Sequence, residues 1–442
     1  MNLLRLLRGP MPLIGGGLAL VVLGGLVFTS VTARALQPFD RPGLAALTAG
    51  LYYLVNTVAL GVFSGVEQEG SRAVSQERAA GRPVTPVVQA MARQALRLFA
   101  LSTAILLLVS PLLVGPVLGG HWELLAELVI ALFATACAST VRGTLAGSQR
   151  FGGYAATQAT EGLTRIVPLL LLLLFGVHQT WAYGLVFVLA QLFAALVGVL
   201  VLRTGTSQSW RQLATTAPAR DLPGAGKVWF GISTGLALLV LASLTNQAVV
   251  NLPPVIATAK LATEPLIATA IAGAIGLTRL PMFAFVPLQT MLLPQLTAAV
   301  GRNDIAGVRR QTLRTAAACV VLGLLGIAFL GFLGPIVLPI YLSGIGGLSG
   351  ATLAGLGIGT LFLMTANVTQ PALIALGRHR TVLVAYLIGT AAMALAFVVP
   401  VEPTLAVVLS TAAGPIALVA VMAVAITKAT STSAVDRQHV MS

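Results

Sequence analysis

Apolar residues occur along this chain in runs of about 20, separated by shorter stretches that hold most of its charged residues. A run of about that length spans the hydrocarbon core of a bilayer as an α-helix, so the pattern predicts an all-α polytopic membrane protein with about 12 spans. The predicted spans are Leu13–Ala33, Leu44–Val66, Leu98–Gly119, Glu123–Val141, Ala155–Gly176, Trp181–Leu202, Trp229–Ile256, Leu266–Leu296, Thr315–Leu338, Ala351–Leu376, Thr381–Val399 and Pro403–Thr427.

Composition supports the same class of protein. Hydrophobic residues make up 57% of the 442 residues and charged residues 9%, whereas soluble proteins carry about 25% charged residues. The net charge of +14 would suggest a nucleic-acid partner in a soluble domain, but here the location of the charges argues against one. Cys137 and Cys319 lie in apolar runs and the histidines lack metal-ligand spacing, so we expect no cofactor and no metal.

The basic residues predict the orientation of the spans. If the N-terminus is cytoplasmic, the inner segments hold 21 of the 26 Lys and Arg residues, and the outer segments hold only Arg34, Arg41 and Lys260. Such a bias is typical of a plasma-membrane protein with both termini in the cytoplasm. Arg165 and Arg279 lie inside spans, so topology does not explain them.

The chain is predicted to consist of two six-helix lobes. Residues 1–202 and 229–428 form the lobes, residues 203–228 a cytoplasmic linker rich in Thr, Ser, Pro and Gly, and residues 429–442 a cytoplasmic tail. "RGTLAGSQR", which begins at Arg142, aligns without gaps with "QPALIALGR", which begins at Gln370, at an offset close to half the chain length. This favours a pseudo-repeat of the kind found in transporters.

Ionisable residues in the fifth and eighth spans are the main candidates for function. Glu161 and Arg165 are four residues apart, so they share one face of a helix and can pair. At about 1.5 Å per residue, Arg165 lies about 15 Å from a helix start at Ala155, close to the middle of the bilayer. Arg279 is similarly deep in its span. These three residues predict a cationic cavity, because a charged side chain inside a membrane costs free energy and usually marks a functional site.

Other polar residues extend this candidate site. We assign Gln158, Arg150, Asn56 and Asn246 to the lining of the predicted cavity. A purely structural reading stays open: Glu161 and Arg165 would then form a packing pair between helices, Arg279 would bond backbone carbonyls, and the asparagines would form interhelical hydrogen bonds.

Three stretches resemble a known family. They are "TARALQPFDRPGLAAL" from Thr32, "RGTLAGSQRFGGYAATQATEGLTRI" from Arg142 and "PALIALGRHR" from Pro371. Together with the span count and the central linker, they make the chain similar to the polysaccharide-flippase branch of the multidrug, oligosaccharidyl-lipid and polysaccharide exporter superfamily. The resemblance implies a V-shaped exporter that flips a polyprenyl-(di)phosphate-linked oligosaccharide from the cytoplasmic to the outer leaflet for polysaccharide synthesis.

Several expectations accompany this resemblance. Membrane lipids and the lipid-linked saccharide are the expected partners, with H⁺, Na⁺ or the membrane potential as the driving force, and pathway glycosyltransferases or a polymerase as protein partners. Two alternatives are a cation-coupled drug or metabolite antiporter and a non-transporting scaffold of a wall-polysaccharide assembly complex. A membrane enzyme is disfavoured, because the predicted outer loops are short and hold no paired carboxylates.

Overall fold

The structure is a computed structural model, and it describes residues 11–36, 43–204, 228–229, 232–282 and 304–440, with a few single residues between 292 and 302. Most of the predicted linker at 203–228, the segment around Asp40 and the two residues at the end of the predicted tail at 429–442 lie outside this part of the chain. The chain divides into two compact units, Met1–Pro265 and Leu266–Ser442. These units are defined by packing, so the predicted lobe boundaries, which follow a sequence repeat, stay a prediction.

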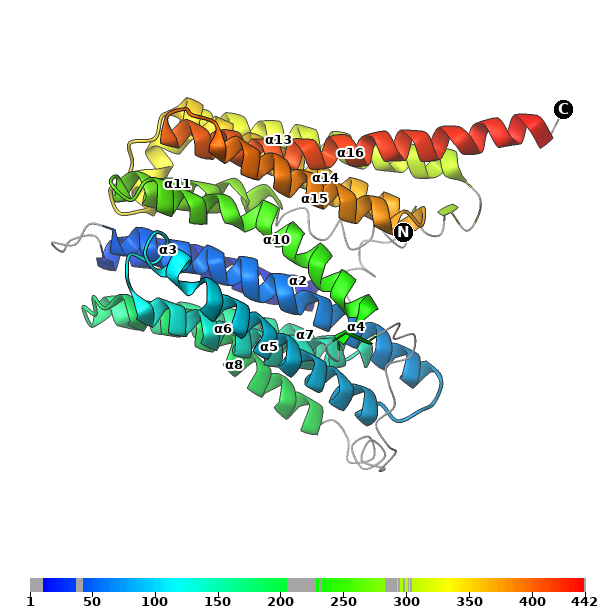
Figure 1. Ribbon diagram of the computed structural model, residues 1–442, viewed down its shortest axis with the longest axis horizontal. Helices are drawn as coiled ribbons and strands as arrows, with labels where there is room; N and C mark the ends of the chain where they lie inside the picture. Colours follow the sequence, from blue (N-terminus) through cyan, green and yellow to red (C-terminus); the bar gives the residue numbers. More distant parts are fainter. Residues whose placement is uncertain are drawn as a thin grey trace. The chain divides into compact units, whose positions relative to one another are not determined.

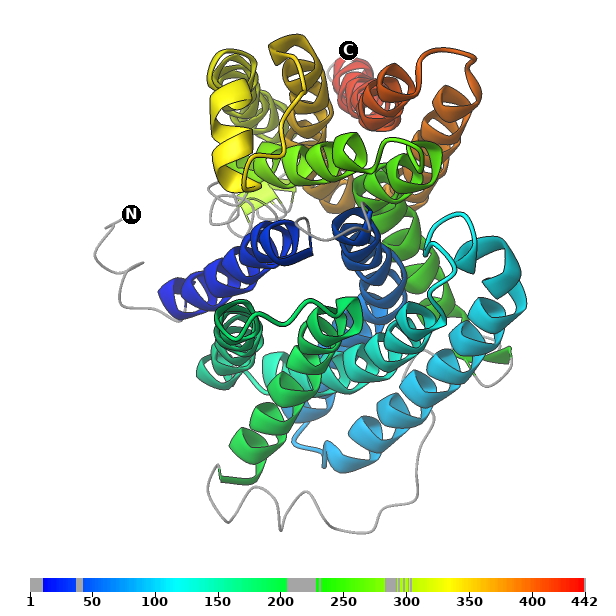
Figure 2. The same ribbon diagram turned by 90° about the vertical axis from the view of Figure 1, so that its left-hand side faces the viewer.

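Unit 1 is a helical bundle, coloured from blue to green in Figures 1 and 2. Its helices are α2 (Met11–Leu36), α3 (Leu44–Val55), a π-helical turn η1 (Asn56–Leu60), α4 (Gly61–Ala79), α5 (Thr85–Val114), α6 (Trp122–Gly147), α7 (Phe151–Leu174), α8 (Thr180–Thr204) and α10 (Thr234–Lys260). The helix α10 packs against α3, η1 and α4. A pair of two-residue antiparallel strands, β1 (Val228–Trp229) and β2 (Ile232–Ser233), precedes it.

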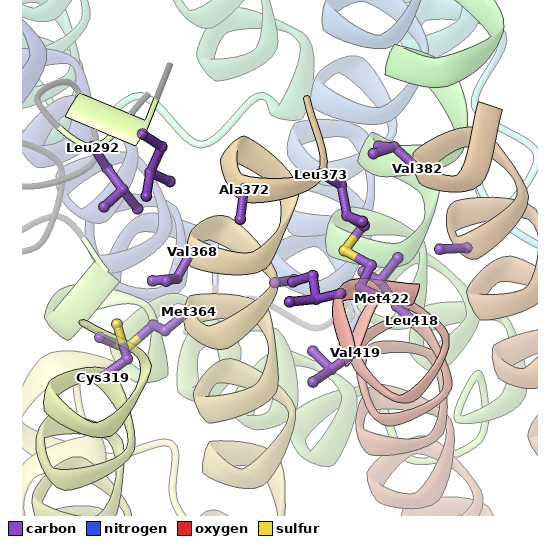
Figure 3. Packing of buried hydrophobic residues seen from close by; sticks show 14 of the residues in the cluster. Leu292, Cys319, Met364, Val368, Ala372, Leu373, Val382, Leu418, Val419 and Met422 are labelled. Carbon is purple, nitrogen blue, oxygen red and sulfur yellow. The ribbon is translucent and has the colours of Figure 1, made fainter. Parts of the chain in front are cut away.

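Unit 2 is also helical. It contains α11 (Pro265–Thr278, whose first residue ends unit 1), α13 (Ile305–Tyr341), α14 (Gly350–Ala375), α15 (His379–Val398) and α16 (Pro403–Val440). Figure 3 shows part of its core, in which Met364 and Val368 of α14 lie near Cys319 of α13. Leu418 and Met422 of α16 belong to the same buried cluster. Apolar packing therefore joins α13, α14 and α16.

Helix length and composition confirm the prediction of an all-α polytopic protein. Within the described residues, eleven helices are long and apolar enough to cross a membrane. The helix α7 is not among them because Gln158, Glu161 and Arg165 lower its mean hydropathy. On α5 the large side chains of Leu101, Ile105, Leu108 and Leu112 are exposed along one face, which suits contact with lipid tails.

Several helices are longer than the predicted spans. The helix that begins at Leu44 continues through η1 to Ala79 rather than ending at Val66, and α5 begins at Thr85 rather than at Leu98. The helix α13 runs from Ile305 to Tyr341. Hydropathy windows end where polar residues accumulate, whereas backbone hydrogen bonds continue a helix beyond the apolar stretch.

The predicted repeat is visible in the backbone. The helices α6 and α14 have 26 residues each, and α6 begins 228 residues before α14. The next helices keep the same offset, because α7 begins 228 residues before α15. Arg150 N donates to Leu145 O at 2.8 Å, and Arg378 N donates to Leu373 O at 2.8 Å. Gln149 and Gly377 take positive φ values of 57° and 72° between these partners. The two helix ends thus form the same C-terminal capping turn.

Glycines permit close helix contacts in unit 1. A Cβ atom on Gly162 of α7 would lie 2.5 Å from the backbone of Leu20 in α2. A Cβ atom on Gly143 of α6 would lie 2.8 Å from Glu67 O in α4, and one on Gly147 would lie 2.6 Å from Ser71 O. The spacing of Gly143 and Gly147 is that of the small-residue pairs that allow membrane helices to approach closely. These contacts hold α7 against α2 and α6 against α4 near the charged residues described below.

Candidate functional site

Glu161 lies at the centre of a buried ionic cluster in unit 1. Its carboxylate accepts from two guanidinium groups, with Arg165 Nη2 donating to Oε1 and Arg142 Nη2 donating to Oε2 at 2.5 Å. The pairing of Glu161 with Arg165, predicted from their spacing, is thus confirmed. The side chains of Glu161 and Arg165 are each only 4% exposed. A carboxylate at this position is stabilised because both oxygens have a cationic partner.

Arg142 was not among the candidates from the sequence. It was assigned to an inner loop after a span ending at Val141, but α6 continues to Gly147 and carries the Arg142 side chain into the bundle. Besides its bond to Glu161, its Nε donates to Thr157 Oγ1 at 3.1 Å. The assignment of Arg142 to a loop is therefore wrong, and this residue links α6 to α7.

The guanidinium of Arg165 also rests on an aromatic ring. Its Cζ lies 4.3 Å from the ring centroid of Phe187 in α8, which is a favourable cation–π distance. Phe187 in turn contacts Phe28 and Tyr52, with ring centroids 5.0 Å and 5.1 Å away. Arg165 Nε is buried and has no hydrogen-bond partner among the described residues. One strong donor of the cluster is therefore available to a further acceptor.

A second carboxylate joins the cluster from α4. Tyr154 of α7 donates from its hydroxyl to Glu67 Oε1 at 2.7 Å. Glu67 also lies beside α6, because a Cβ atom on Gly143, the residue after Arg142, would lie 2.8 Å from Glu67 O. Glu67 directly follows Val66, where the predicted second span ends, and it is half-buried in the structure. Unit 1 thus brings together Glu67, Arg142, Glu161 and Arg165, two carboxyl groups and two guanidinium groups.

These groups change the balance of charge predicted for the membrane-embedded part of the chain. Glu161, Arg165 and Arg279 alone would give one negative and two positive groups inside the membrane, but unit 1 also contains Arg142 and the carboxyl groups of Glu67 and the buried Glu127. Any preference for an anion therefore rests on which groups are available for bonding and not on net charge. In the described parts of the chain, no group of three or more His, Cys, Asp or Glu residues could hold a metal ion.

The structure separates the remaining candidates. Gln158 lies on α7 one turn before Glu161, and its buried Oε1 has no hydrogen-bond partner among the residues that the structure describes. Arg150 instead donates to Val201 O at 2.7 Å and Leu202 O at 3.2 Å, near the C-terminal end of α8. Asn56 begins η1 and donates to Tyr52 O at 2.8 Å.

Two further candidates lie elsewhere. Asn246 is half-buried on α10. Arg279 directly follows α11 in unit 2, where its backbone N donates to Gly276 O at 3.3 Å. The structure therefore brings Arg165, Glu161 and Gln158 together on one helix, while Arg150 and Asn56 bond to backbone carbonyls.

Unit 2 has an uncharged counterpart of the cluster. At the repeat offset of 228 residues, Gln370 of α14 corresponds to Arg142 of α6. Gln370 Oε1 accepts from Tyr386 of α15 at 3.0 Å. Gly389 and Met393 occupy the positions in α15 that Glu161 and Arg165 occupy in α7. The ionic cluster is thus a property of the first repeat.

Comparisons with known proteins identify the fold. No protein-family model and no curated protein matches the sequence. Among solved structures, the chain is similar to an inward-facing multidrug resistance MATE family transporter of the MOP superfamily, with a TM-score of 0.69 and 14% identity over 94% of this chain and 96% of that one.

Two further similarities agree with the first. A mutant of the MATE transporter VcmN of Vibrio cholerae gives a TM-score of 0.60 and 15% identity over 95% of this chain and 96% of that one. The lipid II flippase MurJ gives 0.57 and 12% identity over 96% of this chain and 91% of that one. At these identities the similarity is one of fold over nearly the whole length of each protein.

Proposed function

Because the chain has the fold of the multidrug, oligosaccharidyl-lipid and polysaccharide exporter superfamily, we propose that it is a transporter that works by alternating access. We further propose that its substrate is a polyprenyl-(di)phosphate-linked oligosaccharide, which it moves from the cytoplasmic to the outer leaflet of the plasma membrane. The family resemblance of the sequence and the fold shared with a lipid II flippase support this substrate class.

One observation carries the proposal for a phosphate-bearing substrate. Arg165 keeps a buried Nε–H without a partner in the described part of the chain, while Glu161 has both oxygens occupied by guanidinium groups. Arg165 therefore offers a cationic donor, and neither oxygen of the neighbouring Glu161 carboxylate is left without a partner. A phosphate oxygen is a strong acceptor for such a donor, and arginine is well suited to bind phosphate.

The geometry suggests how a headgroup would bind. A phosphate oxygen accepts from Arg165 Nε while Arg165 Nη2 stays on Glu161, so the substrate adds to the cluster without breaking it. Arg142 holds Glu161 in place from α6. The lipid tail stays in the hydrocarbon beside the helices, since only the headgroup needs a polar path.

The experiment is a flipping assay on the full-length protein in proteoliposomes, with a fluorescent polyprenyl-diphosphate sugar. We expect Arg165→Gln to lower the rate about tenfold or more, because a hydrogen bond to a charged group contributes about 1.5–3 kcal/mol. Arg165→Lys keeps the charge but lacks the Nε donor, so it should not restore the full rate. The matched control is Arg93→Gln, which removes an exposed arginine of α5.

The outcomes separate the alternatives. Wild-type rates in both Arg165 variants would overturn the assignment of Arg165. The antiporter alternative, which the similarity to multidrug MATE transporters favours, predicts transport of a cationic fluorescent dye and no flipping. The scaffold alternative predicts neither activity in the wild-type protein. Arg279→Ala in unit 2 tests the second predicted cavity residue in the same assay.

A further inference from the structure

Another buried carboxyl group of unit 1, that of Glu127, lies away from the ionic cluster. Glu127 is on α6, five residues after Trp122, and is only 2% exposed. Neither of its carboxyl oxygens has a hydrogen-bond partner among the described residues. This differs sharply from Glu161, whose two oxygens each bond to an arginine.

The carboxyl group of Glu127 packs directly against the backbone of α8. A Cβ atom on Gly184 would overlap Oε2 of Glu127 and would lie 3.0 Å from Oε1. The missing side chain of Gly184 thus provides the space that the carboxyl group fills. In this arrangement α8 covers the acid and keeps water from it.

Exposed tryptophans indicate how deep this contact lies. Trp122 on α6 is 59% exposed and Trp181 on α8 is 50% exposed, as expected for aromatic residues at a membrane interface. Glu127 is about 8 Å along the helix from Trp122, at about 1.5 Å per residue. It therefore lies just inside the apolar region, at the end of the bundle that the basic residues predict to be the outer one.

Nearby ionisable groups offer no compensating positive charge. On α6 itself, Glu123 bonds to His121 at 2.6 Å, and its negative charge opposes a second one at Glu127. On α8, the hydroxyl of Tyr183 donates to Val177 O at 2.6 Å. On α5, Arg97 is 17 residues, about 25 Å, before Val114 at the end nearest to Glu127.

The other helices packed against α6 give the same result. The helix α3 contributes the phenol groups of Tyr52 and Tyr53, and η1 contains no ionisable residue. On α4 the first ionisable residue is Glu67, and on α7 Arg165 is bonded to Glu161. Within the described residues, Glu127 is therefore an acid without a cationic partner.

The free-energy cost of burying a charge determines whether Glu127 is protonated. Transferring an ionised carboxylate into an apolar site without a partner costs far more than transferring the neutral acid, so the group takes up a proton when it is covered. If the contact between α6 and α8 opens at this end, water reaches the carboxyl group, its O–H bond breaks and the proton passes to the solvent. Proton binding and the closed contact therefore stabilise each other.

We propose that Glu127 is a proton-binding site of unit 1, protonated while Gly184 of α8 covers it and deprotonated when the contact between α6 and α8 opens. The site is separate from the proposed substrate cluster and goes beyond the proposed function. Its test needs no transported substrate, so a failure of either proposal leaves the other standing. A transporter with this site couples the packing of two helices to the proton concentration at one membrane surface.

Infrared difference spectroscopy tests the proposal on the full-length protein in lipid nanodiscs. Spectra in acidic and alkaline buffer should differ by a C=O stretching band of a protonated carboxyl group, shifted by ¹³C-labelled glutamate. We expect Glu127→Gln to lose this band and to fold, since a neutral amide replaces a neutral acid. Glu123→Gln, which changes an exposed carboxyl one turn earlier on the same helix, should keep it.

A second variant changes Gly184, which covers the carboxyl group, and leaves Glu127 itself intact. In Gly184→Ala the new methyl group displaces the carboxyl group or the helix, so Glu127 meets more water and loses its proton at lower pH. The midpoint of the band should therefore move down by about one pH unit or more. A band that persists in Glu127→Gln, or a midpoint that Gly184→Ala leaves unchanged, would overturn the proposal.

Discussion

Arg142 and Glu161 lie 19 residues apart on two different helices, and Arg142 Nη2 donates to Glu161 Oε2 at 2.5 Å. Arg165, one turn after Glu161, bonds to the other oxygen of the same carboxylate. One carboxylate thus holds two guanidinium groups that would otherwise repel each other inside the bundle. This bridge ties α6 to α7 beside the donor that we assign to the substrate.

The bridge predicts strong coupling between the two helices. Glu161→Gln leaves the buried Arg165 and the largely covered Arg142 without their shared anion, and we expect a loss of about 3–5 kcal/mol in the free energy of unfolding. Arg142→Gln in the same chain should recover part of this loss because it removes one of the unpaired charges. Chemical denaturation in mild detergent measures both. Additive effects of the two substitutions would contradict the shared bridge.

The close contact between α4 and α6 leads to a second prediction. Gly143→Ala places a methyl group 2.8 Å from the backbone oxygen of Glu67, so the helices must separate, and we expect destabilisation of about 1–3 kcal/mol. Gly152→Ala is the matched control, because a Cβ atom there meets nothing within 4 Å and alanine favours the helix. Thermal unfolding followed by circular dichroism compares the two. Equal midpoints would refute the packing argument.

A third prediction concerns pH and the start of α16. The carboxylate of Glu402 accepts from the backbone N–H groups of Thr404 and Leu405, both at 2.9 Å, and these bonds lower its pKa below the ordinary value. A lowered pKa in the folded state stabilises the fold above the ordinary pKa of about 4.3, and this contribution is lost as the pH falls through the lowered value.

The matching measurement is the difference in thermal midpoint between the wild type and Glu402→Gln. We expect the wild type to be more stable at neutral pH and the difference to vanish in acid. A constant difference across this range would show that the carboxylate charge at Glu402 does not act on the helix end.

Local spacing allowed part of the site to be predicted from the sequence. Glu161 and Arg165 are four residues apart in one helix, so their pairing depends on helix geometry alone. The turn after α6 and its repeat after α14 were also visible as an alignment, because both rest on the same short backbone motif.

The rest of the site depends on contacts between helices. Hydropathy windows end at charged residues, so they excluded Glu67 and Arg142 from the spans even though both helices continue. The bond from Tyr154 to Glu67 joins residues 87 positions apart, and no local pattern marks it. Glu127 was missed as a site because the partner that covers it, Gly184, contributes only the absence of a side chain.

The shared turn that ends α6 and α14 has a further consequence for the history of the chain. Two helices of equal length, followed by the same capping turn at a constant offset, are what the duplication of an ancestral gene leaves behind. After such a duplication the copies are free to diverge, and at the positions that correspond to Glu161 and Arg165 the second copy has Gly389 and Met393. At these positions the first repeat therefore carries charged side chains and the second carries neutral ones.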